Sequence, residues 1–303
     1  EMGMSIELFP LLLFIGIGAM IDFGPLLEKP WLMLFGAAAQ FGIFVTLVLA
    51  GLFFDLPDAA SIAVIGAADG PTAIFVANSL GSKYLGAIMV AAYSYMALVP
   101  IVQPPVIKLC TTKKERLIRM PYQKGSVSKT TKILFPIVVT VLAGLVAPAS
   151  VALVGFLMFG NLLRECGVLN ALSETAQNVL ANLITIVLGL TVAGQMTADK
   201  FVQPDTLLIL ALGLLAFVFD TAGGVLFAKL LNLFLPEGKK VNPMIGAAGI
   251  SAFPMSGRVV NQMGLAEDNQ NFLLMYSISV NVSGQIASVI AGGLILTLMS
   301  GIA

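Results

Sequence analysis

The chain has 303 residues, of which 58% are hydrophobic and 11% are charged, and its formal net charge is zero. A mean hydropathy of +0.98 excludes an ordinary water-soluble globular protein, because too little polar surface remains to cover so large an apolar core. Histidine is absent, so proton chemistry must use carboxyl, hydroxyl or amine groups, or water.

The two cysteines and the first residue carry little functional information. Cys110 and Cys166 do not have the spacing of metal ligands, and we interpret them as incidental thiols. The chain begins with Glu1 rather than methionine, and no signal-peptide pattern precedes the first span. We therefore expect that an N-terminal portion of the gene product is missing.

The first half of the chain, residues 1–107, is expected to form membrane-spanning helices. The apolar run Leu32–Phe54 is long enough to cross a hydrocarbon core of roughly 30 Å. The next apolar segment is interrupted at residues 66–71 by the sequence GAADGP, which includes the carboxylate of Asp69. An ionisable residue inside a span is costly and indicates a functional site. We predict a broken helix over residues 61–80.

A polar segment at residues 108–132 separates the two halves. It holds eight of the sixteen basic residues and one acidic residue, Glu115, so the positive-inside rule predicts that it is cytoplasmic. Such a loop could alternatively bind nucleic acid or lipid headgroups, or dock a soluble partner. The basic residues are Lys108, Lys113, Lys114, Arg116, Arg119, Lys124, Lys129 and Lys132.

Residues 133–176 are expected to form one span followed by a hairpin. The run Ile133–Ala147 is apolar, whereas the next segment has two short apolar parts with Arg164 and Glu165 between them. A count of alternating spans requires this second segment to return to the side that it left. We predict that it is a re-entrant or interfacial hairpin.

The last part of the chain, residues 177–303, repeats features of the first half. Five matches occur in the same order at offsets of 174 to 183 residues, and this weak internal symmetry is typical of secondary-transporter folds. It predicts an inverted repeat with a second broken helix over residues 242–263. The matches pair Pro30 with Pro204, GAA at 66–68 with 246–248, NSLG at 78–81 with NQMG at 261–264, Tyr93-Ser94 with Tyr276-Ser277, and Gln103 with Gln285.

The two breaks are interpreted as two halves of one ion site near the membrane midplane. Asp69 can act as an ion ligand, as a proton carrier, or as the N-cap of the half-helix that follows it. The second break offers further amide, hydroxyl and carbonyl oxygens, which suit a hard cation such as Na⁺. The expected ligands are Asp69, Asn242, Ser251 and the backbone near Gly66 and Gly246.

Three other residues are each open to two interpretations. Arg258 is either an interfacial anchor or the partner of an anionic group such as a carboxylate. Tyr95 is either a packing residue or, in the absence of histidine, a proton donor close to Asp69. Asp220, whose repeat mate is Gln40, either lines the ion path or pairs with a polar neighbour.

Motifs from most of the chain point to one family. They are GAADGPTAI at 66–74, AYSYMALVP at 92–100, FGNL at 159–162, GISAFPM at 249–255 and NFLLM at 271–275. With these motifs the chain resembles the beta subunit of the sodium-pumping, biotin-dependent decarboxylases. Family members extend further at the N-terminus, which again leads us to expect that this chain is incomplete.

The resemblance implies both a fold and an activity. It implies an all-α, polytopic membrane protein with inverted repeats, whose core carries two crossed broken helices and moves like an elevator against a scaffold. It also implies that the subunit decarboxylates carboxybiotin, exports Na⁺ and consumes a proton. By resemblance, the family's functional residues fall on Asp69, Tyr95, Asn242, Gly246, Ser251 and Arg258.

The resemblance further implies partners and a location. The expected partners are a biotin-carrying carboxyltransferase alpha subunit, a small single-span gamma or delta subunit and other copies of the beta subunit, but no nucleic acid. The expected location is a prokaryotic cytoplasmic membrane. The competing hypothesis is a stand-alone secondary carrier of similar fold, either a Na⁺/H⁺ antiporter or a Na⁺-coupled anion symporter.

Overall fold

The computed structural model describes residues 8–121, 125–195 and 202–300, and in these residues it is helical and contains no β-strand. Six of its helices are long and apolar enough to cross a membrane. The predicted all-α membrane fold is therefore confirmed. The six are Pro30–Ala50, Leu85–Cys110, Lys129–Val146, Asn170–Thr191, Pro204–Phe234 and Leu274–Ser300.

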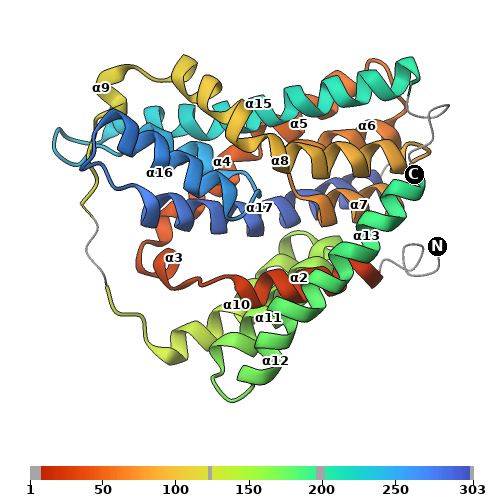
Figure 1. The fold of residues 1–303 in the computed structure, drawn as a ribbon, viewed down its shortest axis with the longest axis horizontal. Helices are drawn as coiled ribbons and strands as arrows, with labels where there is room; N and C mark the ends of the chain where they lie inside the picture. Colours follow the sequence, from red (N-terminus) through yellow and green to blue (C-terminus); the bar gives the residue numbers. More distant parts are fainter. Residues whose placement is uncertain (1–7, 122–124, 196–201, 301–303) are drawn as a thin grey trace.

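The helices form two groups, which lie above and below each other in Figure 1. The smaller group contains α2 (Leu8–Met20), α10 (Lys129–Val146), α11 (Val151–Glu165), α12 (Asn170–Glu174) and α13 (Ala181–Gln195). Its helices α2 and α11 cross closely at Gly18. A Cβ at this position would lie 1.8 Å from the carbonyl oxygen of Leu157, so only glycine fits there. Small residues at a crossing allow such close contact between membrane helices.

The larger group contains the long helices α8 (Leu85–Cys110), α15 (Pro204–Phe234) and α17 (Leu274–Ser300). Around them pack α4 (Met33–Ala39), α5 (Phe41–Ala50), α6 (Leu56–Ala63), α7 (Gly70–Ser79) and α16 (Met255–Glu267). Short connecting helices are α3 (Gly24–Glu28), η1 (Pro30–Leu32), α9 (Lys113–Arg116) and η3 (Pro148–Ser150).

Two helices of the larger group are broken where the sequence predicted, in addition to a short interruption at Gln40 between α4 and α5. The first runs as α6 and the 3-10 turn η2 (Val64–Ala67), passes Ala68 with φ of +52°, and restarts as α7. The second runs as the 3-10 helix η5 (Pro243–Gly249) and restarts as α16 after an irregular stretch that begins with the extended residue Ile250. Both interruptions lie within the segments expected to be broken. The inverted relation of the halves, their crossing and an elevator movement stay predictions.

The expected hairpin after residue 150 has a different form from the prediction. Its first arm is the continuous helix α11, and the chain turns at Gly167, whose φ is +73°. Its second arm is not short, because α12 continues through a π-helical turn, η4 (Thr175–Leu180), into α13. The side of the membrane to which this segment returns stays a prediction.

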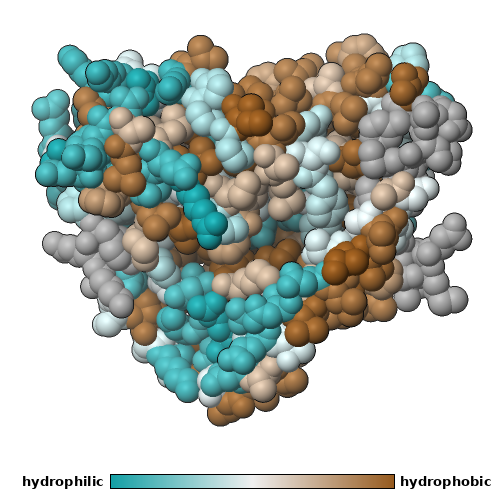
Figure 2. Space-filling view, in the orientation of Figure 1, coloured by the Kyte–Doolittle hydropathy of each residue, from teal (hydrophilic) through white to brown (hydrophobic). Residues whose placement is uncertain are grey.

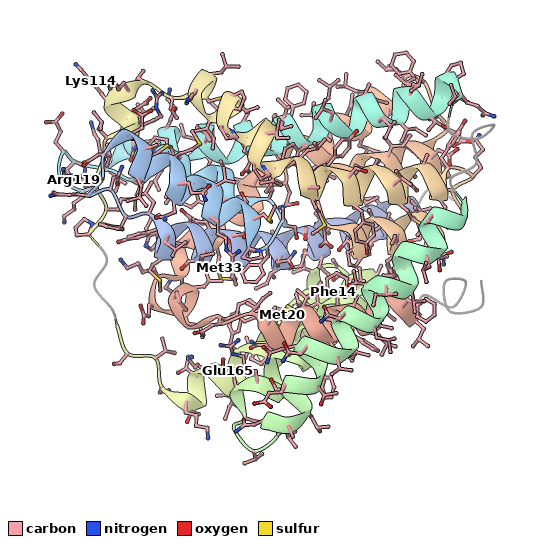
Figure 3. All side chains as sticks on the ribbon, in the orientation of Figure 1. Phe14, Met20, Met33, Lys114, Arg119 and Glu165 are labelled. Atoms are coloured by element: carbon pink, nitrogen blue, oxygen red, sulfur yellow. The ribbon has the colours of Figure 1, made fainter. Side chains whose placement is uncertain are left out.

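The basic segment packs against the end of α16. Arg116 forms an ion pair of 2.6 Å with Glu267, and Arg119 forms one of 2.6 Å with Asp268. Lys124 lies outside the described residues. Hydrophilic side chains gather at this end of the molecule, where Lys114 and Arg119 are labelled, whereas α13 is largely apolar (Figures 2 and 3). This distribution agrees with a polar end that projects from the membrane.

Candidate functional site: a buried carboxylate between two helix breaks

Asp69 is buried at the start of α7, with 3% of its surface exposed. Pro71 in the first turn of α7 lacks an N–H group that would need a partner, and Asp69 caps the free N–H group of Thr72 at 3.3 Å. The hydroxyl of Thr72 donates to Oδ2 of the same carboxylate at 2.7 Å. The cap interpretation of Asp69 is therefore correct as far as local structure is concerned.

The second break and α17 supply two more hydroxyl groups to the same oxygen. Ser251 donates to Oδ2 of Asp69 at 3.2 Å, and Ser288 of α17 donates at 2.9 Å. These two hydroxyls are 2.8 Å apart, and the side-chain amide of Gln285 donates to the Ser251 carbonyl at 2.8 Å. The N–H group of Ser251 also donates to the Ala67 carbonyl at 2.9 Å, which joins the two breaks directly.

A cavity of about 550 Å³ adjoins this cluster. The larger group contributes Asp69, Tyr93, Ser251 and Gln285 to its wall. The smaller group contributes Leu13, Ile17 and Met20 from α2, and Ala181, Asn182 and Thr185 from α13. Figure 3 shows Met20 at the boundary between the two groups. The carboxylate therefore faces the seam between the groups.

Only some of the expected ligands meet Asp69. Asn242 is fully buried, and its side-chain amide donates to the carbonyls of Arg116 and Ile118, both at 2.9 Å. It therefore ties the second break to the basic segment. A Cβ on Gly246 would lie 2.0 Å from the Gly224 carbonyl oxygen, so this glycine permits close contact with α15. The roles of these residues as ion ligands stay predictions.

Gly66 likewise faces α15 rather than the cavity. A Cβ at this position would lie 2.5 Å from the Cβ of Ala216 and 2.8 Å from Oδ2 of Asp220. This close packing explains why residue 66 is a glycine. The expected contribution of its backbone to an ion site stays a prediction.

The two tyrosines of α8 point in different directions. Tyr95, expected to lie near Asp69, donates its hydroxyl to the Leu210 carbonyl on α15 and does not line the cavity. Tyr93 does line it. Arg258 is exposed on α16, and the cavity wall on that side ends at Met255. Asp69 and Arg258 are thus not brought into contact, and the functional roles of Tyr95 and Arg258 stay predictions.

The sequence analysis did not assign Thr72, Gln285 or Ser288 to the cluster around Asp69. Thr72 lies three residues after Asp69, where a capping partner is expected, so its position carried a signal. Gln285 was noted only as a repeat mate. Ser288 lies three residues further along the same helix, and nothing in the sequence distinguished it from the other serines of that span.

The donor set of the cluster suits a hard cation. It combines one carboxylate with hydroxyl and carbonyl oxygens, which are ligands that hard cations prefer. Within the described residues, no group of three or more acidic, cysteine or histidine side chains could hold a metal ion. The cluster thus contains one carboxylate, which supplies one negative charge.

A comparison with known families decides the identity. The family model for the Na⁺-transporting oxaloacetate decarboxylase beta subunit matches residues 1–299. The chain belongs to this family. The resemblance inferred from the motifs is confirmed, and a stand-alone carrier is not favoured.

Curated relatives of this beta-subunit family agree with the assignment. The chain is 55% identical over 294 residues to the oxaloacetate decarboxylase beta chain of Klebsiella pneumoniae, which covers 95% of this chain and 67% of the relative. It is 51% identical over 298 residues to the methylmalonyl-CoA decarboxylase subunit beta of Propionigenium modestum, covering 98% and 75%. The corresponding subunit of Veillonella parvula is 50% identical over 299 residues, covering 98% and 79%.

Proposed function

We propose that this beta subunit releases CO₂ from carboxybiotin held by a partner subunit, and couples that reaction to Na⁺ export with consumption of a proton. Family membership supports the activity. The observation that carries the proposal is the Asp69 carboxylate, which accepts hydrogen bonds from Thr72, Ser251 and Ser288 beside a large cavity.

The transported ion is assigned to this cluster. Each hydroxyl that donates to Asp69 keeps oxygen lone pairs that can face a cation, so the cluster can hold Na⁺ after a small change in hydroxyl orientation. Asn242 and the backbone at Gly66 and Gly246 would join as ligands only after the breaks move, because they make other contacts in this conformation. The movement is the proposed elevator displacement of the larger group against the smaller one.

The decarboxylation step is assigned to the seam and the adjoining face of α16. Cleavage of the N–COO⁻ bond of carboxybiotin releases CO₂ and leaves the nitrogen to take up one proton. Arg258 is exposed, and its guanidinium can pair with a carboxylate in a two-pronged geometry. Asp69 or Tyr95 is proposed to pass on the proton that balances the reaction.

The partners and location follow from the same assignment. A biotin-carrying alpha subunit would approach the polar end formed by residues 108–132 and the end of α16, which we place in the cytoplasm. A single-span gamma or delta subunit and further beta subunits would contact apolar faces within a prokaryotic cytoplasmic membrane. The acid or acyl-CoA is chosen by the alpha subunit, so oxaloacetate and methylmalonyl-CoA are both substrates to test.

Replacement of Asp69 tests this proposal. In the assembled complex in vesicles, Asp69→Asn is expected to abolish Na⁺-stimulated decarboxylation and Na⁺ uptake, because the compensating charge is lost. Asp58→Asn is a matched control, since Asp58 is also a buried aspartate of the first broken helix but pairs with Lys83 at 3.2 Å, away from the cavity. Normal Na⁺ uptake by Asp69→Asn would overturn the assignment.

A second measurement separates the pump from a stand-alone carrier. A pump subunit should co-purify with a biotinylated protein, which an avidin blot detects. Na⁺ transport by the isolated chain, without such a partner and without decarboxylation, would support the carrier instead.

A further inference from the structure

The hydroxyl of Tyr93 is buried and has no hydrogen-bond partner among the described residues. Buried tyrosine hydroxyls usually have a partner, because burial of an unpaired polar group is costly. The residue also lines the Asp69 cavity. A buried, unpaired hydroxyl on a residue of the cavity wall is therefore a candidate contact for something that binds in the cavity.

The ring of Tyr93 is held beside the start of α7. A Cβ on Gly70 would lie 2.8 Å from the ζ-carbon of Tyr93, the ring atom that carries the hydroxyl. Gly70 directly follows Asp69, so the hydroxyl end of the ring packs against the residue next to Asp69, and no hydrogen bond joins the two side chains in this conformation. Tyr93 also packs against an apolar cluster that includes Leu13 of α2 and Ile74 of α7. The ring is therefore held between α8 and these two helices.

Tyr95 cannot take the same place in this conformation. Residues two positions apart on an α-helix point about 200° away from each other, so the two tyrosines occupy opposite faces of α8. Tyr95 faces α15, where its hydroxyl donates to the Leu210 carbonyl. Tyr93 faces the seam between the two helix groups, and its buried hydroxyl has no hydrogen-bond partner among the described residues.

We propose that the Tyr93 hydroxyl is an oxygen ligand of the cation that Asp69 holds. The inference rests on the proposed Na⁺ site. Hard cations take several oxygen ligands. The Tyr93 hydroxyl would add a ligand from α8 to those from the three elements that already contribute hydroxyls. The phenolic oxygen is neutral and has free lone pairs, so it can face a cation without further charge. An occupied site would give the unpaired oxygen its partner.

The experiment compares Tyr93→Phe with Tyr95→Phe in the assembled complex in vesicles. The Na⁺ concentration for half-maximal decarboxylation is expected to rise about tenfold in Tyr93→Phe, as for the loss of one ligand contact. Its rate at saturating Na⁺ should stay within about twofold of the wild type, because the lost contact acts on binding. In Tyr95→Phe the half-maximal Na⁺ concentration should not change, whatever happens to the maximal rate. An unchanged value in Tyr93→Phe, or equal rises in both variants, would overturn the proposal.

Gly70→Ala provides an independent test of the same contact. It can be measured even if the Tyr93→Phe variant does not fold. The added Cβ would push against the ring, and the half-maximal Na⁺ concentration should rise although the hydroxyl is retained. In the double variant G70A/Y93F the rise should equal that of Tyr93→Phe alone, because both changes remove the same contact. A wild-type Na⁺ response in Gly70→Ala, or fully additive rises, would contradict the proposal.

The variants Asp69→Asn and Tyr93→Phe distinguish failure of the tyrosine-ligand proposal from failure of the proposed Na⁺ site. If Asp69→Asn still transports Na⁺, the proposed function fails. If Asp69→Asn is inactive while Tyr93→Phe responds to Na⁺ as the wild type does, only the tyrosine ligand is refuted.

Discussion

Asp69 and Asp220 are both buried carboxylates in the larger helix group, but their partners differ in kind. Besides the backbone N–H group of Thr72, Asp69 accepts from the hydroxyls of Thr72, Ser251 and Ser288. Asp220 accepts from the backbone N–H groups of Gly42 and Ile43, at 3.2 Å for Ile43. A hydroxyl can turn its lone pairs toward a cation, whereas a backbone N–H group can only donate.

An acid buried within a span can thus serve a helix start as well as an ion site. Asp220 caps the start of α5, where the helix is interrupted at Gln40. Its other oxygen has no hydrogen-bond partner among the described residues and lies against Gly66. We therefore assign Asp220 a structural role as the cap of an interrupted helix. The sequence left this residue open between the ion path and a polar pair.

The largest expected effect comes from changing the two acids in the same way. Asp69→Asn should lose Na⁺ stimulation completely, whereas Asp220→Asn should keep it, because an amide oxygen can still accept from Gly42 and Ile43. Decarboxylation by the assembled complex, with and without Na⁺, measures the difference. Loss of the Na⁺ response in Asp220→Asn, with an intact fold, would place Asp220 in the ion path.

Removal of the cap should act on stability instead. Asp220→Leu removes the carboxylate that accepts at the start of α5, while the Ile43 N–H group keeps the Gln40 carbonyl at 3.2 Å, so the free energy of unfolding is expected to fall by about 1 kcal/mol. Thermal unfolding of the purified subunit in detergent would show this as a lower Tm, with Asp220→Asn as the control. Equal Tm values for the two variants would show that the cap contributes nothing.

The hydroxyl shell of Asp69 can be tested one member at a time. Ser288→Ala is expected to raise the half-maximal Na⁺ concentration about tenfold, because one contact of roughly 1.4 kcal/mol is lost. Ser279→Ala on the same helix is the control, since its hydroxyl donates to the Met275 carbonyl, away from the cluster. A similar Na⁺ response in both variants would contradict the role of the hydroxyl shell.

The smallest expected effect concerns the polar end of the molecule. A side-chain hydrogen bond from Arg119, together with the backbone N–H group of Gln270, holds the pKa of Asp268 below its ordinary value. The ion pair therefore stabilises the packing of the basic segment against the end of α16 at neutral pH. This stabilisation is lost as the pH falls below about 4. Proteolytic cleavage within residues 108–132 should become faster at that pH. Arg119→Ala should remove most of this pH dependence, and an unchanged profile would count against it.

Composition and motifs were enough to predict the membrane helices, the two interruptions, Asp69 and the family. These features depend on local patterns: an apolar run predicts a span, and GAADGP cannot continue a helix inside one. Ser251 was also found this way, because it belongs to the second interruption. Family membership followed from motifs spread along the chain and needed no coordinates.

The tertiary structure decided which side chains meet, since that depends on how distant helices are rotated against each other. It placed Tyr93 rather than Tyr95 at the cavity, because a shift of two residues turns a side chain to the other face of α8. It brought Ser288 to Asp69 across 219 positions, and gave Asn242 and Asp220 partners that no local pattern specifies. The acid at the first interruption was visible in the sequence, but its hydroxyl shell exists only where three separate elements pack together.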